Sequence, residues 1–285
     1  MSGYNCLPNL ICPGAPKAGT TTLYNLFSMH PDIYVSDYKE LYYFSNDRIF
    51  SKGLSWYKRN FNGYDGQKYI ADVTPFYLAS LKAPERMYKQ LGGDVKFILM
   101  LRNPAERAYS QYLMQYREGK EMRAFEDVIS DEYKKDEKGS ILNNGLYYKN
   151  IKRFMEYYPL DNFHIVLTKD MKTDFRKTAK ELFAFLGLDD LNSDIEIDAN
   201  SQFQPRRKFL FKMIKKVPNR YKIMFRKFFG IQSKENLMRR LVGSDGSDNI
   251  PMNEETRKWL QEFYRDDIKF LMELTGKDLS CWSKK

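Results

Sequence analysis

The sequence predicts a three-layer α/β fold in which helices flank a central, mostly parallel sheet. Three apolar runs have the composition of buried strands, and they occupy residues 7–12, 95–101 and 163–167. Each run is followed by a stretch with helical periodicity, and this alternation is typical of a parallel sheet covered by helices. With 285 residues, of which 42% are hydrophobic, the chain is long enough to bury one large core.

The helical segments follow in order along the chain and show no internal repeat. We expect helices over residues 20–29, 56–61, 83–91, 104–117, 125–132, 145–157, 175–186 and 254–275. Asn253 is a suitable cap for the last of them. Loops are expected at residues 139–144 and 243–249, since the second contains only Gly, Ser, Asp and Asn. No clear break in composition divides the chain, which is therefore expected to form a single domain over residues 1–285.

One part of the chain is strongly basic, in keeping with a net charge of +10. The region at about residues 203–242 is expected to be helical, and Glu235 is the only acid between residues 206 and 240. Aromatic side chains are interleaved with its lysines and arginines. Two interpretations stay open: an amphipathic helical hairpin with a solvated cationic face, or a landing surface for an acidic acceptor or the surface of a membrane.

Several classes of protein are not expected. No apolar run reaches the roughly 18 residues of a membrane span, and residues 1–13 lack the basic start and long apolar stretch of a signal peptide. Cys6, Cys12 and Cys281 have no Cys-x-x-Cys spacing, so neither a disulfide framework nor a zinc site is indicated. These features favour a cytoplasmic protein without a bound metal.

Residues 9–25 carry the most informative local pattern, a short strand followed by a tight turn and the start of a helix. The backbone N–H groups of such a turn converge on one small space, where the helix dipole also favours negative charge. Lys17 adds a cation, and hydroxyl donors follow at Thr20, Thr21 and Thr22. The pattern predicts the phosphate cradle of a P-loop-like fold; the alternative is a capped helix after an edge turn.

The order of residues differs from that of a Walker A loop. Gly14 and Gly19 have the Walker A separation, but Thr20 stands where that motif has its lysine, and Lys17 lies inside the turn instead. One glycine and three threonines also lower the propensity of this helix start by roughly 2–3 kcal/mol relative to alanine. We therefore interpret these residues as binding residues.

A second anion site is predicted where the apolar run at residues 95–101 ends. Pro104 can open the next helix and leaves Arg102 at the carboxyl edge of the sheet, where α/β domains bind ligands. Ser110 follows two helical turns later. A P-loop hydrolase often has a magnesium-binding aspartate at this strand end, so Arg102 indicates that protein cations replace the metal. The alternatives are a salt-bridged Arg102 and a Ser110 that faces water.

Two motifs in this order resemble the signature elements of sulfotransferases that use 3′-phosphoadenosine-5′-phosphosulfate (PAPS). The first is Pro16-Lys-Ala-Gly-Thr-Thr-Thr22, and the second is Leu101-Arg-Asn-Pro-x-x-Arg-Ala-Tyr-Ser110. Further segments are similar to heparan-sulfate-type and bacterial carbohydrate sulfotransferases, at residues 29–32, 39–44, 53–57, 72–77, 145–147 and 183–188. The resemblance covers most of residues 8–190 and the terminal helix through Trp282.

The resemblance implies donor-binding residues at both motifs. The first loop would bind the 5′-phosphosulfate and the second the 3′-phosphate, which gives the set Lys17, Ala18, Gly19, Thr20, Thr21, Thr22, Arg102 and Ser110. Tyr147 resembles a tyrosine near the nucleotide, although an aromatic residue on a helix is more often part of the core. Arg206 and Arg207 are the best candidates for the family's later nucleotide loop.

Sulfuryl transfer needs a base for the acceptor proton and a cation for the charge that grows on the departing phosphate. The resemblance implies Glu40 as the base, because heparan-sulfate-type enzymes carry their glutamate just ahead of an aromatic pair, and it implies Lys17 as the cation. The alternative for Glu40 is an ion pair with Lys39 on a solvated turn. His30 and His164 are expected to be structural.

Lys39, Asp72 and Thr74 are the candidate acceptor-binding residues. Asp72 and Thr74 lie in a stretch similar to the Glu-Lys-Thr/Ser-Pro of several eukaryotic relatives. Val73 stands where those relatives have a lysine, so no role of that lysine is carried over. The alternative for this stretch is a strand end followed by a turn.

The sequence therefore predicts a metal-independent enzyme that transfers a sulfuryl group from PAPS to a hydroxyl, or less often an amine, of a carbohydrate or glycoconjugate. The acceptor is acidic if the basic region binds it, and no nucleic-acid partner is expected. Two alternatives stay open. One is a P-loop nucleotide kinase or other phosphotransferase, against which the displaced lysine argues, and the other is a non-catalytic protein that binds polyanions through the basic region.

Overall fold

The computed structural model describes residues 7–36, 38–135, 141–191 and 251–283. The chain divides into two compact units, residues 1–199 with 254–285 and residues 200–253. The first unit contains every helix and strand described below. The predicted basic helical region at residues 203–242, with Arg206 and Arg207, and the predicted loop at 243–249 lie outside the described residues. The predicted single domain over residues 1–285 stays a prediction.

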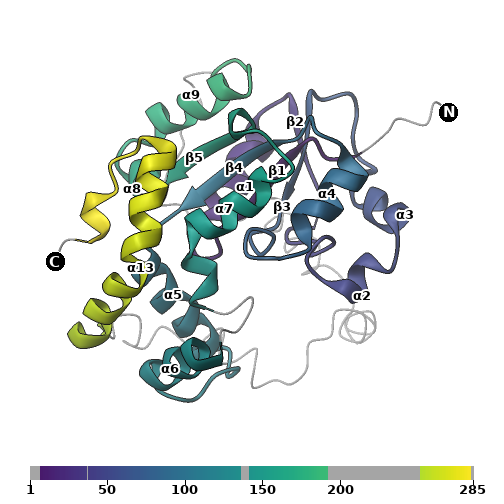
Figure 1. The fold of residues 1–285 in the computed structure, drawn as a ribbon. Coiled ribbons are helices and arrows are strands. Elements are labelled where there is room, and N and C mark those ends of the chain that lie inside the picture. The colour runs from purple at the N-terminus through teal and green to yellow at the C-terminus, as the bar shows by residue number, and fades with distance from the viewer. Residues whose placement is uncertain (1–6, 37, 136–140, 192–250, 284–285) are drawn as a thin grey trace, which may run out of the picture. The chain divides into compact units, whose positions relative to one another are not determined.

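The core of the first unit is a five-stranded sheet in which every strand pair is parallel (Figure 1). In spatial order the strands are β2 (Ile33–Val35), β3 (Tyr69–Val73), β1 (Leu10–Gly14), β4 (Lys96–Leu101) and β5 (Phe163–Leu167). Leu10 pairs with Ala71 on one side and with Lys96 on the other, so β1 is the central strand. The predicted α/β fold with a central parallel sheet is confirmed.

Helices cover both faces of this sheet, which explains the continuous apolar runs of its central strands. Every residue of β4 from Phe97 to Leu101 is buried. Since successive strand side chains point to opposite faces, Phe97 and Met100 lie on different sides of the sheet. Phe97 packs on Phe154 of α7 (Tyr147–Met155), whereas Met100 lies against Gly19 at the start of α1 (Thr20–Met29). In Figure 1, α7 lies in front of the sheet and α1 behind it.

Four helices have the bounds that the sequence predicts: α1, α4 (Ala83–Leu91), α5 (Pro104–Arg117) and α13 (Glu254–Thr275). Three others differ at their ends, namely α6 (Phe125–Lys135), α7 and α9 (Phe175–Phe185). The helix predicted at residues 56–61 is a short α3 (Leu54–Lys58) that continues as a 3₁₀ turn over Arg59–Phe61. Further 3₁₀ turns occur at Asn143–Gly145, Leu160–Asn162 and Ser280–Trp282, so the first of these replaces the end of the loop predicted at 139–144.

Some short elements were not predicted. They are the strands β2 and β3 and the helices α2 (Asp47–Phe50) and α8 (Thr168–Thr173). The three residues of β2 are too few for a recognisable pattern. The apolar run of β3 is interrupted by Asp72, which is buried within the strand. The strand predicted at residues 7–12 begins three residues later, at Leu10. It ends two residues later, at Gly14, because Pro13 and Gly14 continue the extended backbone.

Candidate functional site

The predicted strand, turn and helix at residues 9–25 are present, and together they form an anion-binding geometry. β1 ends at Gly14 and α1 begins after Gly19, whose φ of 99° is easily reached only by glycine. A Cβ atom at Gly19 would also lie 3.1 Å from Met100 Cε. No side chain caps α1 and its first turn contains no acid, so the first N–H groups of the helix have no competing carboxylate.

Lys17 is a half-buried cation within the turn. Its Nζ atom lies 3.6 Å from Met114 Sδ, a weak acceptor, and no carboxylate of the described residues forms an ion pair with it. Burial lowers the pKa of Lys17, and the charges of Arg117 and Arg102 lower it further. The charges of Glu118 and Glu40 act in the opposite direction with a smaller effect. A half-buried ammonium group is stabilised by an incoming anion.

Thr168, which was not predicted, links the loop to the neighbouring strand. Its Oγ1 atom lies 2.5 Å from the carbonyl oxygen of Ala18 and 3.0 Å from that of Leu101. It therefore joins the turn that carries Lys17 to the strand end that carries Arg102. Its position directly after β5, at the carboxyl edge of the sheet, is the sequence signal that could have identified it.

Arg102 and Ser110 lie where the second motif predicts them, at the end of β4 and on α5. The Arg102 side chain is 31% exposed, and its Nη2 atom lies 3.5 Å from Glu106 Oε2. Glu106 also forms an ion pair with Arg257 of α13, so the carboxylate is shared. Ser110 is half-buried. The charge of Arg102 contributes to the lowered pKa of Lys17, so the two cations repel each other.

Tyr147 is a core residue that contacts the backbone of Arg102. The side chain is completely buried, and its ring makes an edge contact with Trp282 at 6.0 Å. The hydroxyl donates to the backbone oxygen of Arg102 across 2.8 Å, and burial raises the pKa of Tyr147 to about 12. This placement matches the core alternative and leaves Tyr147 no surface for direct contact with a nucleotide.

Lys39 connects Glu40 to Thr21 of the phosphate cradle. Lys39 Nζ donates to Thr21 Oγ1 across 2.6 Å and lies 3.6 Å from Glu40 Oε1. Tyr42 donates its hydroxyl proton to Glu40 Oε2 across 2.7 Å. The Glu40 side chain is 32% exposed. The structure therefore brings the predicted base and the first turn of α1 together, with Lys39 between them.

Asp72 and Thr74 do not reach the surface. They are 1% and 0% exposed, and burial raises the pKa of Asp72. Asp72 accepts hydrogen bonds from Thr74, Tyr57 and Tyr77 inside the fold. The direct acceptor contact expected of both residues does not fit this burial, because no part of either side chain is open to a second molecule. Their stretch is the strand end and turn of the alternative interpretation.

Left-handed backbone conformations gather at the site. In the part of the chain that the structure describes, Lys17, Glu40 and Tyr42 are the non-glycine residues with positive φ, at 66°, 64° and 54°. Each such residue costs on the order of 1–3 kcal/mol and persists only where surrounding contacts fix it. The three residues that surround the predicted reaction centre are therefore held by the rest of the fold.

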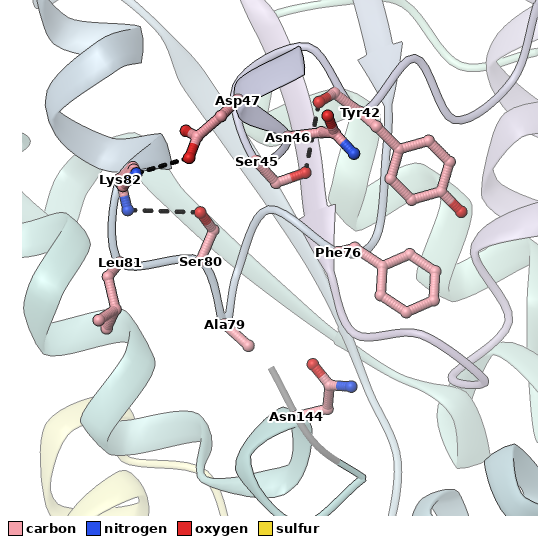
Figure 2. Close-up of a pocket in the computed structure, with 10 residues that line it drawn as sticks. All are labelled: Tyr42, Ser45, Asn46, Asp47, Phe76, Ala79, Ser80, Leu81, Lys82 and Asn144. Atoms are coloured by element: carbon pink, nitrogen blue, oxygen red, sulfur yellow. Dashed lines mark hydrogen bonds and ion pairs between the residues drawn. The ribbon is translucent and has the colours of Figure 1, made fainter. Parts of the chain in front are cut away.

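A cavity of about 410 Å³ adjoins Tyr42 (Figure 2). Its aromatic side is formed by Tyr42 and Phe76, whose rings stack at 5.5 Å, and Figure 2 shows both rings on one side of the space. The full lining is Tyr42, Ser45, Asn46, Asp47, Phe76, Ala79, Ser80, Leu81, Lys82 and Asn144. Aromatic rings beside hydroxyl and amide groups suit a small polar ligand with apolar faces. None of these residues belonged to the predicted site.

The histidines have structural contacts. His30 Nδ1 accepts from the backbone N–H of Asp32, and Nε2 lies 3.0 Å from the carbonyl oxygen of Asp189. His164 stacks on Phe185 at 5.1 Å, and burial lowers its pKa. Among the described residues no group of His, Cys, Asp or Glu is arranged to hold a metal ion. No helix in the described ranges is both long and apolar enough to span a membrane.

Known proteins resemble this chain in sequence and in fold. It is 31% identical to the mouse heparan sulfate glucosamine 3-O-sulfotransferase 5 over 167 residues. This stretch covers 56% of this chain and 47% of that protein. The chain therefore spans about half the length of this curated relative. A sulfotransferase from Alicyclobacillus acidocaldarius has a similar fold, with a TM-score of 0.72, 23% identity and coverage of 98% of this chain and 99% of the other.

A mouse sulfotransferase solved in complex with PAP is a more distant neighbour, with a TM-score of 0.53, 18% identity and coverage of 92% of this chain and 84% of the other. At these identities both solved structures support the fold alone. The family model described as the sulfotransferase domain matches residues 7–275, nearly the whole chain. This match favours the predicted sulfotransferase over the kinase and polyanion-binding alternatives, and the chain belongs to the sulfotransferase family.

Proposed function

We propose that this sulfotransferase transfers a sulfuryl group from PAPS to a hydroxyl of a carbohydrate, with Glu40 as the base. One observation carries the proposal: Lys39 Nζ joins Thr21 Oγ1, at the start of α1, to the Glu40 carboxylate, at 2.6 and 3.6 Å. A carboxylate at this distance from an anion cradle can take a proton from a nucleophile that attacks a group bound there.

The residues present fit a nucleotide that carries phosphate groups at both ends. Lys17, the uncapped first turn of α1 and the threonines at 20–22 would hold the 5′-phosphosulfate, and Arg102 with Ser110 would hold the 3′-phosphate. Membership of the sulfotransferase family supports this choice of donor. One solved neighbour of the same fold has PAP bound. When bound, PAPS supplies a sulfuryl group on a phosphate leaving group.

The chain's own residues would act in three ways. Glu40 accepts the proton of the acceptor hydroxyl, while Tyr42 and Lys39 hold its two carboxylate oxygens. Lys17 offsets the negative charge that grows on the departing phosphate oxygen, which is the largest electrostatic demand of the reaction. Burial of Lys17 strengthens this effect, because the local dielectric constant is lower than that of water.

The acceptor is proposed to be a carbohydrate because relatives named as heparan sulfate sulfotransferases act on one and because Tyr42, which donates a hydrogen bond to Glu40, lines the cavity. A sugar ring presents an apolar face to aromatic rings and hydroxyls to polar groups, as the Tyr42–Phe76 stack and its neighbours offer. Transfer to a hydroxyl is favoured over transfer to an amine, since the relative carries out 3-O-sulfation.

Transfer of labelled sulfate from PAPS to a panel of neutral and acidic glycans, read by mass spectrometry, tests this function. We expect labelled product without added metal and the same rate in the presence of a chelator. A panel that yields neither labelled glycan nor labelled free sulfate would contradict use of the donor. The assay should be accompanied by the same panel with labelled ATP, which is expected to give no product.

A further inference from the structure

Asp72 is a buried carboxylate that accepts its hydrogen bonds from neutral hydroxyls. Its Oδ1 atom accepts from Thr74 Oγ1 at 2.6 Å, and its Oδ2 atom accepts from Tyr57 at 2.7 Å and from Tyr77 at 3.0 Å. In the part of the chain that the structure describes, no lysine or arginine forms an ion pair with it. Burying a carboxylate among neutral donors is costly for folding, so a role beyond stability has to be sought for it.

Two of the three hydroxyls also accept hydrogen bonds from the loop that carries Glu40. Thr74 Oγ1 accepts from the backbone N–H of Leu41 at 3.0 Å, and the Tyr77 hydroxyl accepts from the backbone N–H of Tyr43 at 3.0 Å. A hydroxyl has one proton to donate. Because Asp72 takes that proton in both cases, the lone pairs of both oxygens are directed to the loop, and neither hydroxyl can turn to donate elsewhere.

These bonds act where the backbone is least favourable. Glu40 and Tyr42 have left-handed conformations, and the amides of Leu41 and Tyr43 follow each of them directly. The N–H of Glu40 is tied as well, since it donates to the carbonyl oxygen of Val73 at 3.3 Å. Three backbone amides of the loop therefore form hydrogen bonds to β3 and to the turn that follows it. These bonds hold the loop so that the Glu40 carboxylate faces the Tyr42 hydroxyl.

We propose that Asp72 is a positioning residue, which acts through the hydroxyls of Thr74 and Tyr77 to hold residues 40–43 so that Glu40 faces the phosphate cradle. The inference rests on the proposed role of Glu40 as the base. It assigns Asp72 and Thr74 a function in place of the acceptor contact that their burial does not allow. It also assigns a function to Tyr77, which the sequence did not mark.

Two tyrosines provide a matched pair for the test. Tyr57→Phe and Tyr77→Phe each remove one hydroxyl from a completely buried ring, and each hydroxyl donates to the same Asp72 oxygen. Only the Tyr77 hydroxyl also accepts from the loop. We expect Tyr77→Phe to lower kcat about tenfold or more, because small displacements of a reacting group are costly, with KM for PAPS unchanged. Tyr57→Phe should stay within about twofold of the parent in kcat.

The threonine gives an independent test with a rescue. Thr74→Val removes the hydroxyl that accepts from Leu41, whereas Thr74→Ser keeps it. We expect Thr74→Val to lower kcat as Tyr77→Phe does, and Thr74→Ser to restore it. Equal losses of kcat in Tyr57→Phe and Tyr77→Phe, or in Thr74→Val and Thr74→Ser, would overturn the proposal and reduce the network to a stabilising role.

Hydrogen exchange separates this inference from the proposed function. Amide exchange at Leu41 and Tyr43 does not depend on any activity. The intact protein is labelled, and its peptides are then measured by mass spectrometry. We expect faster exchange over residues 40–43 in Tyr77→Phe and parental exchange in Tyr57→Phe. Unchanged exchange in both variants would overturn the holding role. A parent enzyme that transfers no sulfate would contradict the proposed function and leave the exchange result to decide the role of Asp72.

Discussion

The hydroxyl of Tyr42 donates a hydrogen bond to Oε2 of Glu40 across 2.7 Å, although the two residues are only two positions apart. In an extended strand such a pair would lie on the same face but would not turn toward each other. The contact forms because both residues have positive φ, which brings the phenol over the carboxylate. Burial and the bond to Glu40 raise the pKa of Tyr42, so the phenol stays protonated and remains a donor.

Tyr42→Phe should therefore slow the reaction. Without the hydroxyl that donates to Oε2, the Glu40 carboxylate is no longer held in one orientation. We expect kcat at neutral pH to fall by about tenfold. Tyr43→Phe is the matched control, since it removes the same hydroxyl from a neighbouring ring that is buried away from Glu40. Equal kcat values for Tyr42→Phe and Tyr43→Phe would contradict this account.

Lys17 should take up a proton when an anion binds in alkaline solution. Burial and neighbouring cations lower the pKa of free Lys17, whereas a bound phosphate favours the ammonium form and raises that pKa again. The affinity for adenosine 3′,5′-bisphosphate should therefore decrease as the pH rises through the lowered pKa of Lys17. Calorimetry in two buffers of different ionisation enthalpy measures the proton uptake.

Lys17→Met supplies the control for that measurement. The variant should bind the nucleotide about tenfold to a hundredfold more weakly at neutral pH, as expected for loss of a charged hydrogen bond. It should also show no proton uptake over the same alkaline range. Persistence of the uptake in Lys17→Met would assign it to another group.

Arg102 should be distinguished from Lys17 by the choice of nucleotide. If Arg102 binds the 3′-phosphate, Arg102→Ala should weaken adenosine 3′,5′-bisphosphate by about tenfold or more and leave adenosine 5′-monophosphate almost unchanged. Lys17→Met should weaken both. Calorimetric titrations of the two variants with the two nucleotides give four dissociation constants, each of which is compared with that of the parent. Equal losses for both nucleotides in Arg102→Ala would contradict its assignment.

Asp267 should make the stability of the fold depend on pH. This residue of α13 accepts hydrogen bonds from the backbone N–H groups of Tyr148 and Lys149 at 3.0 Å, and burial raises its pKa from 3.8 to about 6. The folded state therefore holds a proton that the unfolded state releases. The stabilisation is complete below about pH 4 and is lost as the pH rises through about 6.

The free energy of unfolding should decrease by about 3 kcal/mol as Asp267 ionises across this pH range. Urea unfolding at intervals from pH 4 to pH 7 measures it. Asp267→Asn removes the titration, so the difference in unfolding free energy between the parent and this variant should follow the predicted pH window. A difference that is constant across the window would show that Asp267 does not titrate there.

Much of the fold could be predicted because its signals are local. The periodicity of α1, α4, α5 and α13 lies within each helix, and β4 is buried on both faces, which gives a continuous apolar run. The turn around Lys17 was also readable, because the glycine at position 19 and the threonines after it are unfavourable for an ordinary helix start.

The roles of Asp72 and Tyr147 could not be predicted, since they depend on contacts far along the chain. Asp72 is buried by tyrosines at positions 57 and 77, and no local pattern distinguishes a buried strand-end carboxylate from an exposed one. Tyr147 reaches the backbone of Arg102 from 45 residues away. The cavity beside Tyr42 combines loops whose proximity the sequence does not reveal. The predicted cytoplasmic location stays a prediction.

Single-turnover transfer of labelled sulfate by Glu40→Gln tests the central claim most directly. The variant keeps the size of the side chain but has no basic oxygen, so it should bind adenosine 3′,5′-bisphosphate as the parent does. Its transfer rate should fall by about a hundredfold or more, as expected for loss of a general base. A near-normal transfer rate in a variant with parental nucleotide affinity would show that the base lies elsewhere.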